Sequence, residues 1–213
     1  MYINRGPISL KRKFDKVFEQ NLFHGESSKS GNGSSKAQTA EISFQIPNLV
    51  SQLNISSILD LPCGDLEWMK HVNLNGANYI GGDVSPSLIS HLKLEFPDRE
   101  FQILNVTKDS LPKVELVFCR DLFVHLSDKD IKLAIQNIKL SKSKFLATTT
   151  FTDRTSNKDL ALFTRNIAWR PLNLELAPFL LPPPIKLINE KCSEAGGEFG
   201  DKSIGIWKIA DLI

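Results

Sequence analysis

Short apolar runs alternate with helical patterns along most of the chain. Five runs have the length and character of buried strands: 57–61, 77–83, 100–106, 114–119 and 144–151. Helical spacing of apolar residues follows three of them, at 66–72, 85–94 and 127–138. This alternation predicts a parallel sheet with helices on both faces. After the fifth run, a helix is predicted over 159–168 and an irregular, proline-rich segment over 169–184. Two later runs, 185–188 and 203–209, predict an antiparallel pair that closes the sheet.

The segment before the first strand has a different pattern. Residues 8–23 carry apolar side chains at three- and four-residue spacing, which predicts an amphipathic helix that covers another element. The Gly/Ser-rich residues 24–35 have the composition of a flexible linker. Alternatively, their N–H and hydroxyl groups close over a polar ligand. A helix is predicted over 40–53, with Thr39 as its cap and Pro47 kinking or splitting it.

Polar residues stand where the predicted parallel strands end. In an open parallel sheet the ligand lies at these carboxyl ends, so they are the candidate site residues: Asp60, Gly64, Asp83, Asn105, Arg120 and Asp121. Residues 57–69 read as a strand, a tight turn and a helix N-terminus, the first unit of a nucleotide-binding sheet. Asp83 follows Asp60 by 23 residues, the spacing at which a carboxylate accepts the hydroxyls of a ribose.

The charge of the first turn indicates which nucleotide is bound. Asp60 and Asp65 flank Pro62, Cys63 and Gly64. Two partly desolvated carboxylates this close would repel a pyrophosphate by several kcal/mol. They would attract an ammonium or a sulfonium. S-adenosylmethionine carries both of these, together with a ribose and no phosphate, so the turn favours it over NAD.

The motif Asp60-x-Pro-Cys-Gly-Asp-x-x-Trp-Met69 resembles a bacterial subgroup of the class I S-adenosylmethionine-dependent methyltransferases. The similarity spans 57–209, and segments 25–34, 120–126 and 169–174 share it. It implies an α/β, Rossmann-like methyltransferase fold: a mostly parallel seven-stranded sheet, an antiparallel closing strand and an N-terminal helical cover. Residues 1–54 would form the cover and 55–213 the methyltransferase domain, as one structural unit. The Gly/Ser segment then becomes a loop that closes over the cofactor.

The resemblance also implies a set of cofactor-binding residues. The predicted set is Gly31, Gly33, Ser34, Asp60, Pro62, Cys63, Gly64, Asp65, Asp83, Val84, Asn105, Val106 and Arg120. Three positions depart from the wider superfamily pattern. Pro62 and Leu66 stand where glycine is usual, and Asn105 stands where an acid commonly reads the adenine amino group.

Methyl transfer requires alignment of acceptor, methyl group and sulfur, and orientation alone is worth about 7–11 kcal/mol. A hydroxyl or ammonium acceptor also needs a base. His125 is the predicted base, oriented by Asp121 one helical turn away. Alternatively, His125 packs against or caps the next helix, and Asp121 is the base or binds the methionine end of the cofactor. Trp68, Arg170 and Asn173 are predicted substrate contacts, unless the segment around Arg170 is only an anchored loop.

No metal is predicted, because the fifth strand ends in threonines rather than in a carboxylate. Nucleic acid is an unexpected partner, since 26 basic and 24 acidic residues leave a net charge of only +2. The segment 120–123 also lacks the Pro-Pro turn of nucleic-acid amino-methyltransferases. The basic cluster 11–13 has no apolar run after it, which argues against a signal peptide. We therefore expect a cytoplasmic protein without a membrane span.

The acceptor is expected to be a small molecule or a saccharide-linked group. O-methylation in surface-glycan or specialised metabolism is the predicted role, and this context comes from the resemblance alone. Two other classes remain open from the residues: an NAD- or nucleotide-sugar-dependent oxidoreductase, and a non-catalytic module that binds S-adenosylmethionine. The residues do not indicate an oligomeric state.

Overall fold

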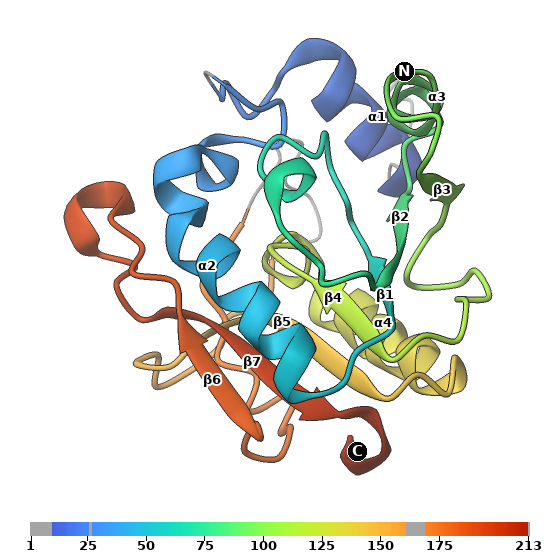
Figure 1. The fold of residues 1–213 in the computed structure, drawn as a ribbon. Coiled ribbons are helices and arrows are strands. Elements are labelled where there is room, and N and C mark those ends of the chain that lie inside the picture. The colour runs from blue at the N-terminus through green and yellow to red at the C-terminus, as the bar shows by residue number, and fades with distance from the viewer. Residues whose placement is uncertain (1–9, 26, 161–168, 213) are drawn as a thin grey trace, which may run out of the picture.

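The computed structural model describes residues 10–25, 27–160 and 169–212. A seven-stranded sheet forms its centre, in the order β3-β2-β1-β4-β5-β7-β6 (Figure 1). Its strands are β1 Ser57–Asp60, β2 Asn78–Asp83, β3 Glu100–Ile103, β4 Leu116–Cys119, β5 Phe145–Phe151, β6 Lys186–Asn189 and β7 Lys202–Lys208. The first five strands are parallel, and β7 is antiparallel to both β5 and β6. The predicted sheet with its closing strand is confirmed.

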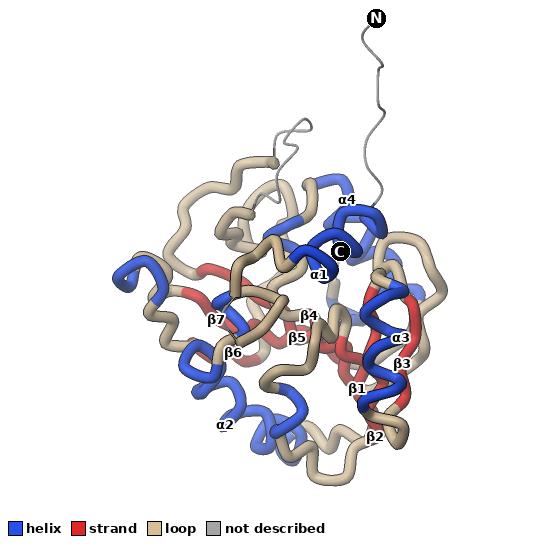
Figure 2. The backbone as a smooth tube through the Cα atoms, turned by 90° about the horizontal axis from the view of Figure 1, so that it is seen from above, coloured by secondary structure: helices blue, strands red, loops and turns tan. Residues whose placement is uncertain are grey.

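Helices cover both faces of the sheet (Figure 2). Side chains alternate along each strand, so Ile58 and Leu59 belong to different apolar clusters. Helices α2 (Lys36–Gln52) and α3 (Pro86–Glu95) bury their apolar sides in the cluster that contains Ile58. Helix α4 (Asp128–Leu140) and the irregular segment 172–181 pack in the cluster that contains Leu59. Helix α1 (Leu10–Gln20) lies beside α3 (Figure 1).

Two predicted helix starts are confirmed at the atomic level. Ser85 caps α3 by accepting a hydrogen bond from the Leu88 N–H, and Pro86 occupies the first helical position. Ser127 caps α4 by accepting from the Asp130 N–H at 3.1 Å. Each cap follows directly on a loop that carries site residues, so it holds the end of that loop in place.

Two parts of the prediction for α2 are wrong, its cap and a split at Pro47. Its cap is Ser35, and Thr39 lies inside the first turn, where its hydroxyl donates to the Ser35 carbonyl at 2.9 Å. Pro47 does not split the helix, which continues to Gln52. Proline removes a single backbone hydrogen bond. The four buried apolar side chains on both sides of it stabilise the continuous helix: Ile42, Ile46, Leu49 and Val50.

No α-helix follows β1, contrary to the prediction. Leu66 adopts a left-handed backbone with φ of 57°, and only a single 3-10 turn forms at Met69–His71. Leu66 and Met69 are buried, so packing of these side chains holds the segment in its irregular path. The turn after β1 therefore presents no helix N-terminus.

The remaining differences concern element ends. Strands β3, β4 and β5 begin or end one to three residues inside their predicted ranges. The helix predicted over 159–168 lies almost entirely outside the described residues. Segment 169–184 is irregular, as predicted. Across the described ranges, no helix has both the length and the apolar character needed to cross a bilayer.

Candidate functional site

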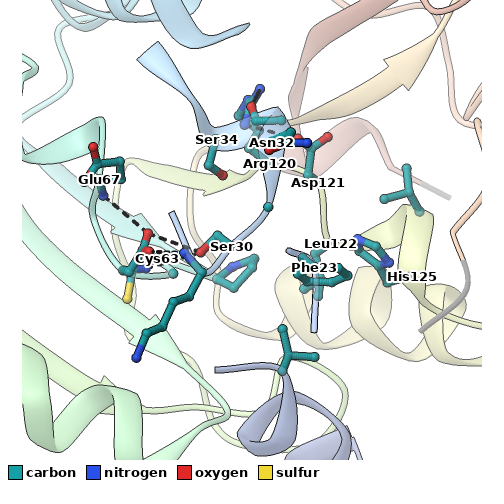
Figure 3. A pocket seen from close by; sticks show the side chains of 18 of the residues that line it. Phe23, Ser30, Asn32, Ser34, Cys63, Glu67, Arg120, Asp121, Leu122 and His125 are labelled. Atoms are coloured by element: carbon teal, nitrogen blue, oxygen red, sulfur yellow. Dashed lines mark hydrogen bonds and ion pairs between the residues drawn. The ribbon is translucent and has the colours of Figure 1, made fainter. Parts of the chain in front are cut away.

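A cavity of about 450 Å³ opens at the carboxyl ends of β1, β2, β4 and β5. This volume lies in the range of small-molecule sites. Figure 3 shows Cys63 and Glu67 on one side of the cavity and Arg120 and Asp121 across from them. The predicted residues that line it are Gly31, Gly33, Ser34, Asp60, Pro62, Cys63, Gly64, Asp65, Trp68, Asp83, Arg120, Asp121 and His125. The fold thus brings together residues from the N-terminal loop and three strand ends.

Two buried carboxylates form the floor of the cavity. Asp60 accepts a hydrogen bond from the Tyr79 hydroxyl at 2.7 Å, and burial raises the pKa of Asp60 to about 7. Asp83 accepts from the Ser85 N–H at 2.9 Å, and burial raises the pKa of Asp83 to about 6. Both side chains are less than a tenth exposed. A ligand that brings hydroxyl donors or a cation would stabilise their ionised forms.

Asp65 has a role beyond the predicted one. Its carboxylate accepts hydrogen bonds from the hydroxyl of Ser28 at 2.9 Å, the N–H of Lys29 at 2.7 Å and the hydroxyl of Ser30 at 3.3 Å. Gly64 has a positive φ of 53°, and a side chain there would run into the Ser30 hydroxyl. The acidic turn and the N-terminal loop are therefore in close contact. Asp65 fastens the loop over the cavity and also lines it, so its contact with the cofactor stays a prediction.

A buried ion-pair network lies under the same loop. The Arg120 guanidinium bonds Glu190 at 2.7 Å and pairs with Asp121 at 3.1 Å, and the Lys202 ammonium donates to Asp121 at 2.7 Å. The Arg120 Nη2 also donates to the Gly33 carbonyl at 2.9 Å. The network thus ties the Gly/Ser loop to β4, β6 and β7.

The network argues against the prediction that Asp121 is a general base. The positive charges of Arg120 and Lys202 hold the pKa of the Asp121 carboxyl well below its usual range, although burial opposes them. A carboxylate stabilised by two cations is a poor proton acceptor near neutral pH. Asp121 instead orders the wall between the loop and β7.

His125 lies farther along the cavity beside Phe23 (Figure 3). Its ring centroid is 5.2 Å from that of Phe23 and 6.3 Å from that of Phe14, in a tilted and an edge-on arrangement respectively. The imidazole is therefore positioned by aromatic rings of the N-terminal segment. Both proposed roles of His125, base and packing residue, are compatible with this place.

Arg170 and Asn173 do not line the cavity, which corrects their prediction as substrate contacts. The Arg170 guanidinium donates to the Leu126 carbonyl at 2.6 Å and pairs with Asp128 at 2.7 Å. The Asn173 side chain bonds neighbouring backbone groups, including the Arg154 carbonyl at 3.2 Å. Both side chains therefore anchor loops, which is the alternative left open for this segment.

Val84, Asn105 and Val106 line a second, small cavity of about 40 Å³. It borders the main cavity, because Pro62 and Asp83 line both. The Asn105 amide oxygen accepts from Thr107 N–H at 2.9 Å and Thr107 hydroxyl at 2.7 Å. The Asn105 N–H donates to Asp109 at 2.7 Å and its carbonyl accepts from Lys108 and Asp109, so the predicted adenine contact would fall to the amide nitrogen of its side chain. Apart from Asp83 and Asn105 the lining of the small cavity is apolar, and at this volume the small cavity cannot enclose a purine base.

The sequence analysis missed a group of cavity residues near the closing strand. They are Phe151 from β5, Trp169, and Glu194, Phe199 and Lys202 from the β6–β7 region. Strand β6 runs parallel to β5, so the residues that follow it reach the same edge of the sheet. The acids Glu190 and Glu194 after the sixth run were the available signal. Phe14, Phe18 and Phe23 of the N-terminal segment were also missed as lining residues.

The fold has counterparts among solved structures, although no family model and no curated protein matches the sequence. The N-methyltransferase NodS from Bradyrhizobium japonicum, crystallised with S-adenosylhomocysteine, superposes with a TM-score of 0.62 at 12% identity, over 91% of this chain and 98% of that one. The 1,6-didemethyltoxoflavin-N1-methyltransferase from Burkholderia thailandensis superposes with a TM-score of 0.61 at 12% identity, over 98% and 97%. The chain therefore has the Rossmann-like fold of class I methyltransferases.

Proposed function

We propose that this protein is an S-adenosylmethionine-dependent methyltransferase with a small-molecule acceptor. The observation that carries the proposal is the pair of buried carboxylates, Asp60 and Asp83, at adjacent strand ends in one cavity. Such a pair suits a ligand that carries a ribose and a cationic amino acid. The two solved structures with the same fold are methyltransferases bound to S-adenosylhomocysteine, which supports the same assignment.

The cavity offers a place for each part of the cofactor. Asp83 at the end of β2 would accept hydrogen bonds from the ribose hydroxyls, and the adenine would lie in the main cavity where Phe14 and Leu122 also border the small one. Asp60 and the turn at Gly64 would face the ammonium group. The loop residues Gly33 and Ser34 would cover the methionine end. Ionised Asp60 and Asp83 gain partners in this arrangement, which offsets the cost of their burial.

The turn after β1 weighs against a dinucleotide cofactor. A pyrophosphate in this fold class lies on the N-terminus of the helix that follows the first strand. This chain has a left-handed residue at Leu66 and no α-helix between β1 and β2. Asp60 and Asp65 add negative charge at the same place. The NAD-dependent alternative therefore lacks its phosphate site.

The cofactor supplies an activated methyl group, and the protein positions and shields the reaction. The loop at 28–34, fastened by Asp65 and Arg120, excludes water from the cavity. His125 is proposed to accept the acceptor's proton, since Asp121 is neutralised by two cations. O-methylation and a role in glycan or specialised metabolism are proposals that rest on the sequence resemblance. A cytoplasmic location is a proposal that rests on the lack of a signal-peptide pattern after residues 11–13.

Calorimetric titration of the purified protein with S-adenosylmethionine, S-adenosylhomocysteine and NAD tests the cofactor assignment. We expect both sulfur ligands to bind and Asp83→Asn to weaken them by about 10- to 100-fold, because a hydrogen bond to a charged group contributes about 1.5–3 kcal/mol. Asp98→Asn is the matched control, since Asp98 is exposed and outside the cavity. NAD binding without S-adenosylmethionine binding would refute the proposal.

A further inference from the structure

An aromatic cluster lines the side of the cavity opposite Asp83. Trp169 and Phe199 have centroids 4.9 Å apart at 70°, and Phe151 and Phe199 lie 6.2 Å apart at 85°. These are edge-to-face contacts of the kind that aromatic rings prefer. Trp169 is 44% exposed and lines the cavity, so its ring is available to a ligand.

The order of the sheet places this cluster on the acceptor side. Asp83 ends β2 and Phe151 ends β5, with β1 and β4 between them. If the cofactor extends from Asp83 to the turn after β1, the space near Phe151 is left for the molecule that receives the methyl group. This step rests on the proposed function.

The cluster is held in place before any ligand binds. The Arg154 guanidinium lies 5.8 Å from the ring centroids of both Phe151 and Phe199. It also pairs with Asp201 at 2.7 Å and donates to the Glu198 carbonyl at 2.8 Å. These contacts clamp the loop that carries Phe199 onto the end of β5. A preorganised wall loses little side-chain entropy on binding.

Glu194 supplies one uncommitted carboxylate beside this wall. A methyl group on Gly33 would lie 3.5 Å from the Glu194 Oε2 and 3.7 Å from the Asp121 Oδ2. Both carboxylates therefore lie close to Gly33 of the loop. Asp121 is paired with cations, whereas no ion pair of the described residues uses Glu194. The recorded side-chain partner of Glu194 is the weakly donating Cys192 thiol at 3.7 Å.

We propose that this subsite takes a flat aromatic acceptor, with its ring against Trp169 and Phe199. A hydroxyl or amine hydrogen other than the one that His125 would accept in the reaction is held by Glu194. A saccharide fits less well. Each buried sugar hydroxyl needs a partner, and the other charged groups on this side, Asp121 and Lys202, already bond each other. The structure thus favours the small aromatic class over the saccharide-linked class for the acceptor.

Ligand-observed NMR on the full-length protein, saturated with S-adenosylhomocysteine, tests the inference. The probes are catechol and β-naphthol, compared with methyl glucoside and methyl mannoside. We expect the aromatic probes to bind and Trp169→Leu or Phe199→Leu to weaken them by about three- to tenfold. Phe44→Leu is the matched control, because Phe44 is 70% exposed on α2 and outside the cavity.

The carboxylate has its own test. Glu194→Gln should weaken catechol binding by about tenfold, while Glu198→Gln, an exposed neighbour outside the cavity, should leave it unchanged. Calorimetry with S-adenosylhomocysteine on every variant separates the two proposals. Wild-type protein that fails to bind it would overturn the proposed function and this inference together. Three results would overturn the acceptor class alone, provided that the cofactor binds normally. The first is a preference for the sugar probes, and the second is the absence of binding by any aromatic probe. The third is unaltered catechol binding in the Trp169, Phe199 and Glu194 variants.

Discussion

Replacing Glu190 with glutamine perturbs the buried network that supports the loop. The Glu190 side chain is fully buried and accepts from the Arg120 Nε at 3.1 Å and Nη2 at 2.7 Å. It also lies 3.6 Å from the Lys202 ammonium. Arg120 and Lys202 are only 5% and 6% exposed, so water replaces little of a lost contact. In Glu190→Gln, the two buried cations would keep Asp121 as their ion-pair partner, with Glu194 farther off in the same cavity.

Removing one partner of a buried ion pair costs about 3–5 kcal/mol. Glutamine keeps one carbonyl oxygen as an acceptor for Arg120, so we expect a loss of about 3 kcal/mol in the free energy of unfolding. For a chain of this size that corresponds to a fall in Tm of about 6–12 °C. Urea unfolding followed by circular dichroism measures the free energy, and a thermal scan measures Tm.

The matched control is Glu41→Gln on the surface of α2. Glu41 pairs with Lys191, whose side chain is 73% exposed, so water can replace the lost contact and we expect a much smaller change. A loss below about 1 kcal/mol for Glu190→Gln would refute the reasoning. It would mean that Arg120 and Lys202 find other partners or reach solvent.

Three further predictions address the loop, the acids and the base. Asp65→Asn should leave the fold intact and weaken S-adenosylhomocysteine binding by about tenfold in calorimetry, because charge-assisted bonds to the loop are lost; unchanged affinity would contradict the fastening role. Cofactor affinity should rise between about pH 5.5 and 8, as Asp83 and Asp60 ionise with pKa values of about 6 and 7, and Asp60→Asn should flatten this slope. In the ligand-free protein, the stability of the fold changes with pH in the opposite direction to the cofactor affinity. The proton held by folded Asp60 stabilises the fold below its ordinary pKa of 3.8, and this contribution is lost as pH rises through about 7. His125→Gln should lower the rate of methyl transfer to an acceptor, measured as formation of S-adenosylhomocysteine, by about 100-fold or more without altering cofactor affinity. An unchanged rate would show that His125 is not the base.

The strands and the helices α3 and α4 could be predicted because the residue patterns that mark them lie within each element or directly before it. A buried strand such as β5 is a continuous apolar and β-branched run, and the caps Ser85 and Ser127 stand directly before their helices. The closing strand β7 was predicted for the same reason. The helix predicted after β1 is wrong because the apolar residues of 66–72 have the spacing of an amphipathic helix. The path of this segment is decided by burial of Leu66 and Met69 and by contacts to a distant loop.

The site residues divide in the same way. Asp60 and Asp83 lie in the cavity as strand-end positions imply. The roles of Asp65 and Asp121 depend on partners 35–37 and 81 residues away in the chain, which no local pattern shows. The prediction for Arg170 is wrong because a polar side chain in an irregular segment can either bind a ligand or anchor the loop, and the sequence does not distinguish the two.

A crystal structure of the complex with S-adenosylhomocysteine tests the central claim most directly. We predict that the ribose hydroxyls bond Asp83, that the amino group faces Asp60 and Gly64, and that the adenine lies in the main cavity near Phe14 and Leu122, where the small cavity adjoins it. The sulfur would then point toward the space before Trp169. A ligand bound elsewhere, or a ribose without contact to Asp83, would contradict this account.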